Sequence, residues 1–405
     1  MESTGLSTST GRSDVYYDPY DVAIVADPYP VYRRMREEAP LYYNEPLDFY
    51  AVSRWEDVES GLRDASTFIS GRSAILELIR ANVELPPGVF IFEDPPAHTI
   101  HRRLVSRVFS PRRVAELEGK VREFCVQCLD PLVGTDRFDI IANLGAQVPM
   151  KTISMLLGIP ETDQEAFRDH ADANLRTEAG KPMKVSSERL ISGEVFADFV
   201  DWRTEHPSDD LMTDLVQAEF VDETGRTRRL ERQELLTYLE VISGAGNETT
   251  NRLVGWTAKV LAEHPDQRRQ VTEDRSLIPN TIEEILRYEP PAHHTARYVA
   301  RDVEVLGHEL REGSVMIFLL GSANRDDRRH PDGDLFDIHR DIGQILTFGQ
   351  GIHLCLGAAL ARLEGRIVLD ELLSRFPEWD VDLSEASLSP TSTVRGWERL
   401  PVVVR

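Results

Sequence analysis

Apolar residues recur at three- and four-residue spacing over much of the chain, which is the pattern of amphipathic helices. The pattern predicts helices over 29–39, 97–109, 114–132, 232–262 and 281–288, often with Pro or Gly at their ends. Shorter runs typical of strands occur at 50–52, 297–306, 314–320 and 401–404, interrupted by Gly or Pro. We therefore expect a mainly α fold, with one large helical domain and small β-sheets instead of a central sheet.

The first 14 residues differ from the rest of the chain because they are polar and rich in Ser and Thr. They lack the apolar core of a signal peptide, and no later run of about 20 apolar residues predicts a membrane span. No repeat, low-complexity tract or Gly/Ser/Pro linker divides the remainder. We expect a disordered lead over 1–14 and a single domain over 15–405.

The overall charge narrows the choice of partners. The 405 residues include 69 acidic and 46 basic side chains, giving a formal net charge of -23. This balance disfavours a general nucleic-acid or anionic-membrane surface, because phosphates are repelled at long range. Three cysteines are too few and too odd in number for a disulfide framework, which favours a reducing, cytoplasmic location.

One of the three cysteines lies between a glycine-rich loop and a helix. Residues 348–357 read Phe-Gly-Gln-Gly-Ile-His-Leu-Cys-Leu-Gly, and a strong helix-forming segment follows. The glycines allow a tight turn and the close approach of a bulky group. Backbone N–H groups and the positive end of the helix favour a thiolate at Cys355, the form that binds a metal. The alternative is a buried structural cysteine in a turn.

This pattern resembles the haem-binding loop of the cytochrome P450 family, F-x-x-G-x-x-x-C-x-G, at every fixed position. The resemblance implies that haem b (iron protoporphyrin IX) is the cofactor and Cys355 the axial ligand of its iron. It also implies the cofactor-binding residues Phe348, Gly349, His353, Cys355 and Gly357, with Phe348 shielding the sulfur from water. Four motifs in family order, spread over residues 27–404, carry the resemblance.

A second motif is Glu284-Ile285-Leu286-Arg287, which places a carboxylate and a guanidinium on one helical face. Alone it is a weak signal, but its place before Cys355 is that of the family's K-helix pair. Arg340, after a segment at 322–326 that resembles the family's A-N-R-D, would be the third partner. The resemblance implies that Glu284, Arg287 and Arg340 support the shape of the cysteine loop without taking part in the chemistry.

A third motif, residues 245–250, interrupts the longest helical pattern with Gly and two successive threonines. These residues are unfavourable inside a helix, so a requirement other than helix stability placed them there. The segment resembles the family's A/G-G-x-D/E-T-T, which implies that Glu248 and Thr249 deliver protons during dioxygen activation. Glu replaces the more frequent Asp. The alternative is that the threonine hydroxyls merely bond to helix carbonyls.

A fourth motif, residues 94–103, reads D-P-P-x-H-x-x-x-R and places His98 and Arg102 on one helical face. In the family these two side chains meet the haem propionates. By the same resemblance Arg297 and His353 complete the cationic group around the two carboxylates. Without the resemblance, the His and Arg would be interpreted as a solvated helix face.

The resemblance also locates the substrate, a lipophilic small molecule such as a steroid, terpenoid, fatty acid or aromatic compound. The implied substrate-pocket residues are Val241, Ala245, Ala292 and His294, with contributions from 69–93, 170–200 and the Val394–Trp397 turn. Adjacent His293 and His294 point to different sides, which argues against a metal pair.

The pair Cys125 and Cys128 has the C-x-x-C spacing of zinc and redox sites. No second C-x-x-C, H-x-x-H or preceding strand accompanies it, so we interpret both as small apolar residues on a helix.

A cluster of arginines stands out in this acidic chain: Arg102, Arg103, Arg107, Arg112 and Arg113. Such a run is usually a solvated face. The resemblance implies instead that it steers an acidic ferredoxin toward the cysteine side of the haem. The short stretch after the cysteine helix leaves no space for a fused electron-transfer domain, which implies a separate ferredoxin and ferredoxin reductase.

Together the motifs imply a haem-thiolate monooxygenase that hydroxylates, dealkylates or epoxidises its substrate with O2 and two electrons. Two alternatives stay open at this stage. One is a peroxide-driven haem-thiolate enzyme, which the Glu248-Thr249 pair disfavours. The other is a non-catalytic haem- or ligand-binding protein.

Overall fold

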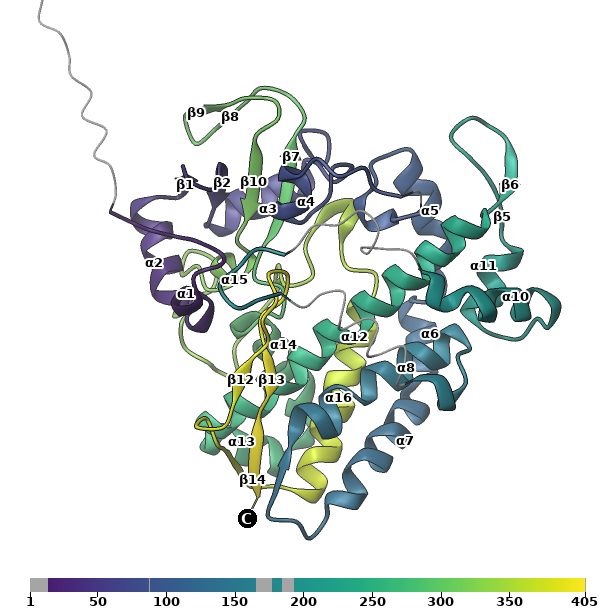
Figure 1. Cartoon of the computed structure of the whole chain (residues 1–405). Coiled ribbons are helices and arrows are strands. Elements are labelled where there is room, and N and C mark those ends of the chain that lie inside the picture. The colour runs from purple at the N-terminus through teal and green to yellow at the C-terminus, as the bar shows by residue number, and fades with distance from the viewer. Residues whose placement is uncertain (1–13, 87, 165–176, 184–192, 405) are drawn as a thin grey trace, which may run out of the picture.

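The computed structural model describes residues 14–86, 88–164, 177–183 and 193–404, and helices are its predominant regular element (Figure 1). The predicted disordered lead over 1–14 lies, except for its last residue, outside the described residues. The α-helices are α1 (Val22–Ala26), α2 (Tyr29–Glu38), α3 (Trp55–Arg63), α4 (Leu76–Arg80), α5 (Ala97–Ser106), α6 (Pro111–Ala115), α7 (Glu118–Leu129), α8 (Val148–Leu157), α10 (Ala197–Glu205), α11 (Leu211–Gln217), α12 (Arg232–Glu263), α13 (Pro265–Glu273), α14 (Ile278–Tyr288), α15 (Leu320–Ala323) and α16 (Ala358–Arg375).

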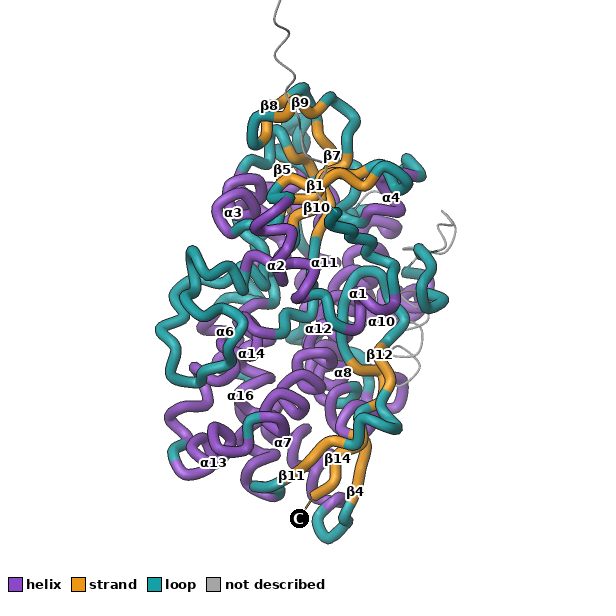
Figure 2. Tube along the Cα trace, turned by 90° about the vertical axis from the view of Figure 1, so that its left-hand side faces the viewer, coloured by secondary structure: helices purple, strands orange, loops and turns teal. Residues whose placement is uncertain are grey.

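The strands are short and form small sheets, as the sequence predicts. They are β1 (Leu41–Asn44), β2 (Phe49–Val52), β3 (Phe68–Ile69), β4 (Arg137–Asp139), β5 (Glu219–Val221), β6 (Thr227–Arg229), β7 (Thr295–Val299), β8 (Val303–Val305), β9 (His308–Leu310), β10 (Val315–Phe318), β11 (Trp379–Val381), β12 (Ser387–Leu388), β13 (Trp397–Arg399) and β14 (Pro401–Val404). The largest sheet has the order β1-β2-β10-β7-β3, and Figure 2 shows it at one end of the molecule with most helices at the other.

Most predicted helices are confirmed, but the run over 114–132 is not one helix. It divides into α6, α7 and a short 3-10 turn at Asp130–Leu132. The division lies beside Leu117, whose side chain packs against two separate hydrophobic clusters, one around α7 and α14 and one around α8 and α11. Hydrophobic periodicity identifies the apolar face of a helix, but it does not show that residues on this face pack into two different hydrophobic clusters.

Helix α12 is the central element of the fold and crosses the molecule beside α8 and α16 (Figure 1). A capping box of Glu231 and Glu234 starts it, and Pro265 follows its end at His264. Its side chains are buried over much of its length, including Trp256, which is 1% exposed. A helix covered on all sides fixes the positions of its polar residues against several neighbouring elements.

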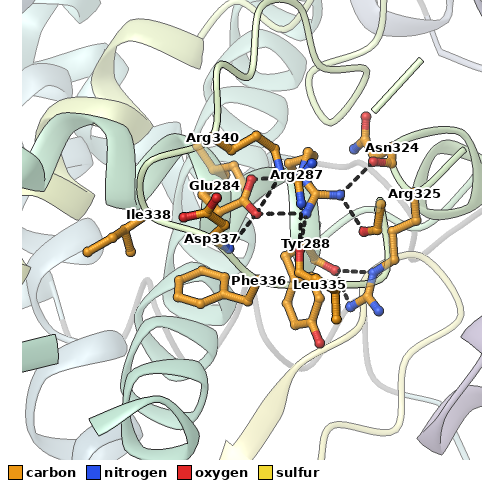
Figure 3. A network of polar contacts seen from close by, with 12 residues as sticks. Glu284, Arg287, Tyr288, Asn324, Arg325, Leu335, Phe336, Asp337, Ile338 and Arg340 are labelled. Atoms are coloured by element: carbon orange, nitrogen blue, oxygen red, sulfur yellow. Dashed lines mark hydrogen bonds and ion pairs between the residues drawn. The ribbon is translucent and has the colours of Figure 1, made fainter. Parts of the chain in front are cut away.

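The three residues Glu284, Arg287 and Arg340 form one network, shown in Figure 3. Glu284 and Arg287 are both 0% exposed, and Arg287 Nε and Nη2 each donate to the Glu284 carboxylate at 2.7 Å. Arg340 Nε donates to Glu284 Oε1 at 3.1 Å. Arg287 Nη1 also donates to the carbonyls of Asn324 at 2.9 Å and Gly333 at 2.7 Å. Removing one partner of such a buried ion pair is costly, because the other charge and its hydrogen-bonding groups are left buried without compensation.

The network reaches the cysteine loop through the side chain of Asn324. Asn324 Oδ1 accepts from Leu346 N at 2.8 Å, and Asn324 Nδ2 donates to Thr347 Oγ1 at 2.8 Å. Thr347 in turn donates to the carbonyl of Leu286 at 2.7 Å, in the same helix as Arg287. The two residues before Phe348 are therefore bonded to the segment that carries the buried pair.

We predict that Arg287→Lys lowers the free energy of unfolding by about 3 kcal/mol, because a lysine keeps the charge but loses the fork of bonds. Amide hydrogen exchange over 346–357 should accelerate as well. The control is Arg33→Lys, which alters an exposed pair with Asp334 and should cost no more than about 1 kcal/mol in urea unfolding. Equal effects of the two substitutions would contradict the support role.

A second buried carboxyl lies in the helical core. Glu364 of α16 is 2% exposed and lies within hydrogen-bonding reach of the hydroxyl groups of Thr152 of α8 and Thr250 of α12. Its Oε1 atom has no hydrogen-bond partner among the described residues. Burial raises the pKa of Glu364 to about 8, although the two threonines lower it. The side chain is therefore protonated in the folded protein at neutral pH.

We predict that the Glu364 carboxyl makes stability fall as pH rises. The folded state retains a proton that the unfolded state has lost, so this group stabilises the fold below its ordinary pKa of 4.5, and the contribution disappears as pH rises through about 8. Glu364→Gln has no group that titrates at this position, so it should remove that dependence. The free energy of unfolding of the variant, relative to that of the wild type, should therefore increase by about 3 to 5 kcal/mol between pH 4.5 and about 8. Thermal unfolding at successive pH values measures it, and parallel curves for the two proteins would refute the assignment.

Candidate functional site

The cysteine loop has the conformation that its glycines suggest. Gly349 and Gly351 adopt φ values of 70° and 72°, a region that other residues avoid. A Cβ atom at Gly351 would lie 2.8 Å from the Leu62 carbonyl oxygen. Cys355 N donates to the Phe348 carbonyl at 2.8 Å, and α16 begins three residues later at Ala358. The thiol therefore sits before the N-terminus of a long helix, as predicted.

The protein alone does not ionise this thiol. The N–H groups of Gly357 and Ala358 and the guanidinium groups of Arg102 and Arg362 lower the pKa of Cys355, but burial outweighs them and raises it. The backbone N–H groups therefore lower the pKa of Cys355, as predicted, but they lower it by less than burial raises it. A bound metal supplies the missing positive charge, because coordination removes the proton from a thiol.

Gly357, two residues after Cys355, leaves space for a large group. A Cβ atom at Gly357 would meet no protein atom within 4 Å among the described residues. Cys355 is open to this space, although the surrounding protein atoms still remove enough water from the thiol to raise its pKa. The open side of the loop is therefore the side on which a flat cofactor fits.

Four basic side chains, His98, Arg102, Arg297 and His353, lie at or near the loop, and burial outweighs the nearby carboxylates of Glu93 and Asp94 in its effect on their pKa values. The rings of His98 and His353 lie 4.2 Å apart, and both ring nitrogens of buried His98 have no hydrogen-bond partner in the described protein. Burial lowers the pKa of His98 and of Arg102, that of His353 to about 3 and that of Arg297 to about 10. Depressed pKa values in every member of a cationic cluster indicate a site that accepts an anion.

These cations have few partners within the protein. Arg297 Nη1 donates to Thr295 Oγ1 and to the Ala296 carbonyl, each at 2.7 Å, and Arg102 donates to the carbonyl of Leu354. Two carboxylates entering this cluster would raise all four pKa values and form charge-assisted bonds. The cluster, the thiol and the space beside Gly357 together fit haem b, with its two propionates and its iron.

Phe348 is half-buried at the start of the loop. The guanidinium carbon of Arg362 lies 4.4 Å from the centre of its ring, and Arg362 pairs with Glu283 through contacts of 2.6 and 2.7 Å. The ring is thus held by a cation that is itself fixed to α14. Shielding of the sulfur by this ring stays a prediction.

Glu248 and Thr249 lie next to each other on α12, but the structure does not bond their side chains to each other. Thr249 Oγ1 donates to the Ala245 carbonyl at 2.9 Å, the back-bonding that was the alternative interpretation. Glu248 accepts from Arg252 Nη2 at 3.2 Å. Ala245 is exposed in the middle of this otherwise buried helix, which marks the face of α12 open to a ligand.

The predicted substrate residues are distributed over several elements. Val241 is buried on α12, Ala292 packs against the sheet cluster, and His294 lines a small pocket with Val394. Neighbouring His293 is buried in the wall of the same pocket, and neither of its ring nitrogens has a partner in the described residues. Of the range 170–200, residues 170–176 and 184–192 lie outside the described residues.

The two other cysteines are free thiols on α7, in agreement with the apolar interpretation. Cys125 is 0% exposed within the main hydrophobic cluster, and burial raises its pKa well above the ordinary value. Over the described residues, no three His, Cys, Asp or Glu side chains gather as a metal site.

The arginine cluster has an inner and an outer part. Arg102 turns inward to the cysteine loop, whereas Arg103, Arg107, Arg112 and Arg113 are exposed. Arg112 and Arg113 both pair with Glu116, at 3.7 and 3.2 Å.

Sequence reasoning missed two buried polar residues, Arg252, which pairs with Glu248, and Glu364 in the helical core. Arg252 lies four residues after Glu248, a spacing that predicts a side-chain pair on one helical face. Glu364 carried no such signal, because only the packing of α8, α12 and α16 reveals that it is buried.

Comparison with known proteins agrees with this geometry. The family model for cytochrome P450 matches residues 199–393. The chain is 38% identical to a putative cytochrome P450 123 of Mycobacterium tuberculosis, across 99% of this chain and 100% of the relative. The structure of cytochrome P450 CYP109Q5 from Chondromyces apiculatus superposes with a TM-score of 0.84 at 32% identity, covering 96% of this chain and 98% of that one.

A further solved relative is CYP109E1 from Bacillus megaterium in complex with testosterone, with a TM-score of 0.84, 28% identity, and coverage of 95% of this chain and 99% of that one. In the part of the chain that the structure describes, no helix has the length and apolar character to cross a bilayer. The chain belongs to the cytochrome P450 family of haem-thiolate monooxygenases.

Proposed function

We propose that this monooxygenase oxidises a lipophilic small molecule with O2 and two electrons delivered by a separate ferredoxin and its reductase. The observation that carries the proposal is the exposed Cys355 at the start of α16, next to a cluster of four basic side chains with depressed pKa values. Haem b, when bound, supplies the activation of O2 and the insertion of one oxygen atom into the substrate.

The chain's own residues have distinct tasks in this proposal. Cys355 binds the iron through its sulfur and donates electron density to it. His98, Arg102, Arg297 and His353 would hold the two propionates through charge-assisted hydrogen bonds. Glu284, Arg287 and Arg340 hold the loop through Asn324.

Glu248 and Thr249 handle protons. Thr249 Oγ1, now bonded to the Ala245 carbonyl, can rotate about χ1 to donate toward the open face of α12. The Glu248 carboxyl carries protons between buried water and that hydroxyl. Because O2 reduction consumes protons inside a dry site, loss of either group should divert electrons to hydrogen peroxide.

The substrate is a largely apolar compound that contacts Val241, Ala245, Ala292, His294 and the Val394–Trp397 turn. The apolar side chains favour a hydrocarbon skeleton, and half-buried His294 can bond one polar group on it. The testosterone complex of CYP109E1 supports a steroid as the first compound to try. A low-spin to high-spin shift of the Soret band on adding testosterone would support this class.

We predict that Cys355→Ala abolishes the shifted absorption band of the reduced, carbon-monoxide-bound protein from which the family takes its name. The band depends on a thiolate ligand to the iron, and Cys355 is the residue proposed to supply it. Cys128→Ala, a thiol on α7 away from the loop, is the matched control and should keep the band. A variant without Cys355 that kept the band would end the assignment.

The outer arginines are proposed as the ferredoxin docking surface. Arg103 and Arg107 are exposed one turn apart on and just after α5, the helix that also carries His98 and Arg102. A cationic surface so close to the haem site on a chain of net charge -23 attracts an acidic partner locally.

We predict that Arg103→Glu combined with Arg107→Glu raises the KM for an acidic ferredoxin roughly tenfold at low ionic strength, and that added salt reduces the difference. The control is Arg226→Glu, which reverses one exposed arginine at the turn before β6 and should leave the KM unchanged. Unaltered ferredoxin kinetics in the double variant would remove this surface from the proposal. Turnover with hydrogen peroxide but none with ferredoxin would favour the peroxide-driven alternative instead.

A further inference from the structure

A cavity that shares no described lining residue with the haem site lies between the end of α8 and the helices α10 and α11. Its volume is about 310 Å³, and small-molecule pockets measure from about 300 to 1,000 Å³. Figure 1 shows α10 and α11 on the opposite side of the molecule from α1 and α2. The described residues that line the cavity include Gly158, Asp198, Phe199, Trp202, Arg203 and Met212. None of these six has a role in the proposed monooxygenase reaction.

The walls of this cavity are largely apolar. Phe199 and Trp202 are three residues apart on α10, so their rings lie on one face of the helix. Trp202 is 54% exposed, whereas Met212 of α11 is 1% exposed and belongs to a hydrophobic cluster of the core. An exposed indole near a buried thioether leaves a gap that an apolar skeleton can fill, and the flexible methionine side chain adapts to its shape.

Polar contacts among the three helices hold the cavity in shape. Arg203 Nη2 donates to the Gly158 carbonyl and pairs with Asp210 Oδ2, at 2.8 Å each. Asp210 is also the N-cap residue of α11. The ring of His206 stacks on that of Trp202, with the two centres 4.7 Å apart. A pocket fixed in this way needs little reorganisation to bind a ligand.

The charge at the rim of the cavity is negative. Asp198 is exposed and makes no hydrogen bond or ion pair with another described residue. The guanidinium of Arg232 is paired with Asp201, at 2.9 Å. Residues 194–214 include one arginine, Arg203, and seven carboxylates: Glu194, Asp198, Asp201, Glu205, Asp209, Asp210 and Asp214. Such a surface attracts a cation and repels an anion.

Arg203 provides the argument for the opposite charge. Its Nε atom is buried and has no hydrogen-bond partner among the described residues, so it could donate to an anion after a rearrangement. The Arg203 side chain is only 11% exposed, however, and Asp210 already neutralises its charge. Asp198, by contrast, is open to solvent at the rim. The observations therefore favour a cation.

We propose that this cavity is a ligand site for a lipophilic ammonium ion, distinct from the substrate pocket. The apolar skeleton packs on Phe199, Trp202 and Met212, and the ammonium group pairs with Asp198. Asp198 and Trp202 are four residues apart on α10, so the carboxylate and the indole lie on one face and can contact the same ligand.

The test uses the whole chain, loaded with haem, in its reduced, carbon-monoxide-bound form, so that an amine does not bind the iron. The methionine methyl groups carry ¹³C, and Met212→Leu identifies the Met212 resonance. Three probes of similar shape and different charge are titrated: 1-naphthylmethylammonium, 1-naphthylmethanol and 1-naphthoate. The resonance of Met316, which is 0% exposed in β10, is the reference and should not move.

We expect naphthylmethylammonium to shift the Met212 resonance saturably. The Kd of the neutral probe should be about threefold higher and that of naphthoate higher still, because an exposed carboxylate adds a small attraction for a cation. Added salt should reduce these ratios. Equal Kd values for the three probes, or the lowest value for naphthoate, would overturn the cationic class, and the second result would assign the cavity to Arg203.

Two variants separate the contributions of charge and apolar contact. Asp198→Asn should abolish the preference for the cation and leave the Kd of naphthylmethanol unchanged. Trp202→Ala should raise the Kd of all three probes roughly tenfold, because the indole supplies much of the apolar contact. Asp201→Asn is the matched control, since it removes an exposed carboxylate of the same helix that is not among the lining residues, and it should leave every Kd unchanged.

Folding of each variant is checked by its carbon-monoxide band and by the Met316 resonance, both of which should match the wild type. A Met212 resonance that shows no saturable shift up to the solubility of the probes overturns the site. A preference for the cation that persists in Asp198→Asn overturns the role of Asp198. These results do not depend on turnover, so they leave the proposed monooxygenase function to its own tests.

Discussion

The bond between Glu284 and Arg287, closed off from solvent on both sides, is the contact from which the geometry of the site extends. Its two side chains satisfy each other, and Arg287 has donors left for carbonyls on the segment after α15. That segment includes Asn324, which bonds the residues just before the cysteine loop. A buried ion pair adds little stability by itself, but it penalises any arrangement that leaves one charge alone. The position of Cys355 therefore follows from a pair that does no chemistry.

Charge explains why the loop then requires its cofactor. Burial raises the pKa of Cys355 and lowers those of His98, Arg102, Arg297 and His353, so the protein alone opposes every charge that the site is built to use. A metal cation beside the thiol and two carboxylates beside the basic groups reverse both effects together. The site is complementary to a group that carries both signs of charge at fixed separation, and a porphyrin with an iron centre and two propionates is such a group.

Features that depend on residues close together in the sequence could be predicted, whereas features that depend on contacts between distant segments could not. The cysteine loop, the Glu284-Arg287 pair and the mainly α fold were predictable because short motifs and helical periodicity encode them locally. The division of 114–132 was not, since it depends on Leu117 reaching two cores. Glu364 was not predictable either, because its burial results from three helices far apart in the sequence. Helical spacing could have indicated the Glu248–Arg252 pair, but not that Ser389 and Trp397 hold Arg252.

The polar residues of α12 bring these points together. A helix buried along most of its length disfavours Glu and Arg in its middle, and an (i, i+4) pair between them offsets only part of the desolvation. The remainder is offset by the β12–β13 hairpin, whose hydroxyl and carbonyl satisfy the guanidinium. The contact between α12 and the hairpin therefore explains how a charged arginine is accommodated in the middle of a largely buried helix, because the groups that satisfy it come from a segment more than 130 residues further along the chain.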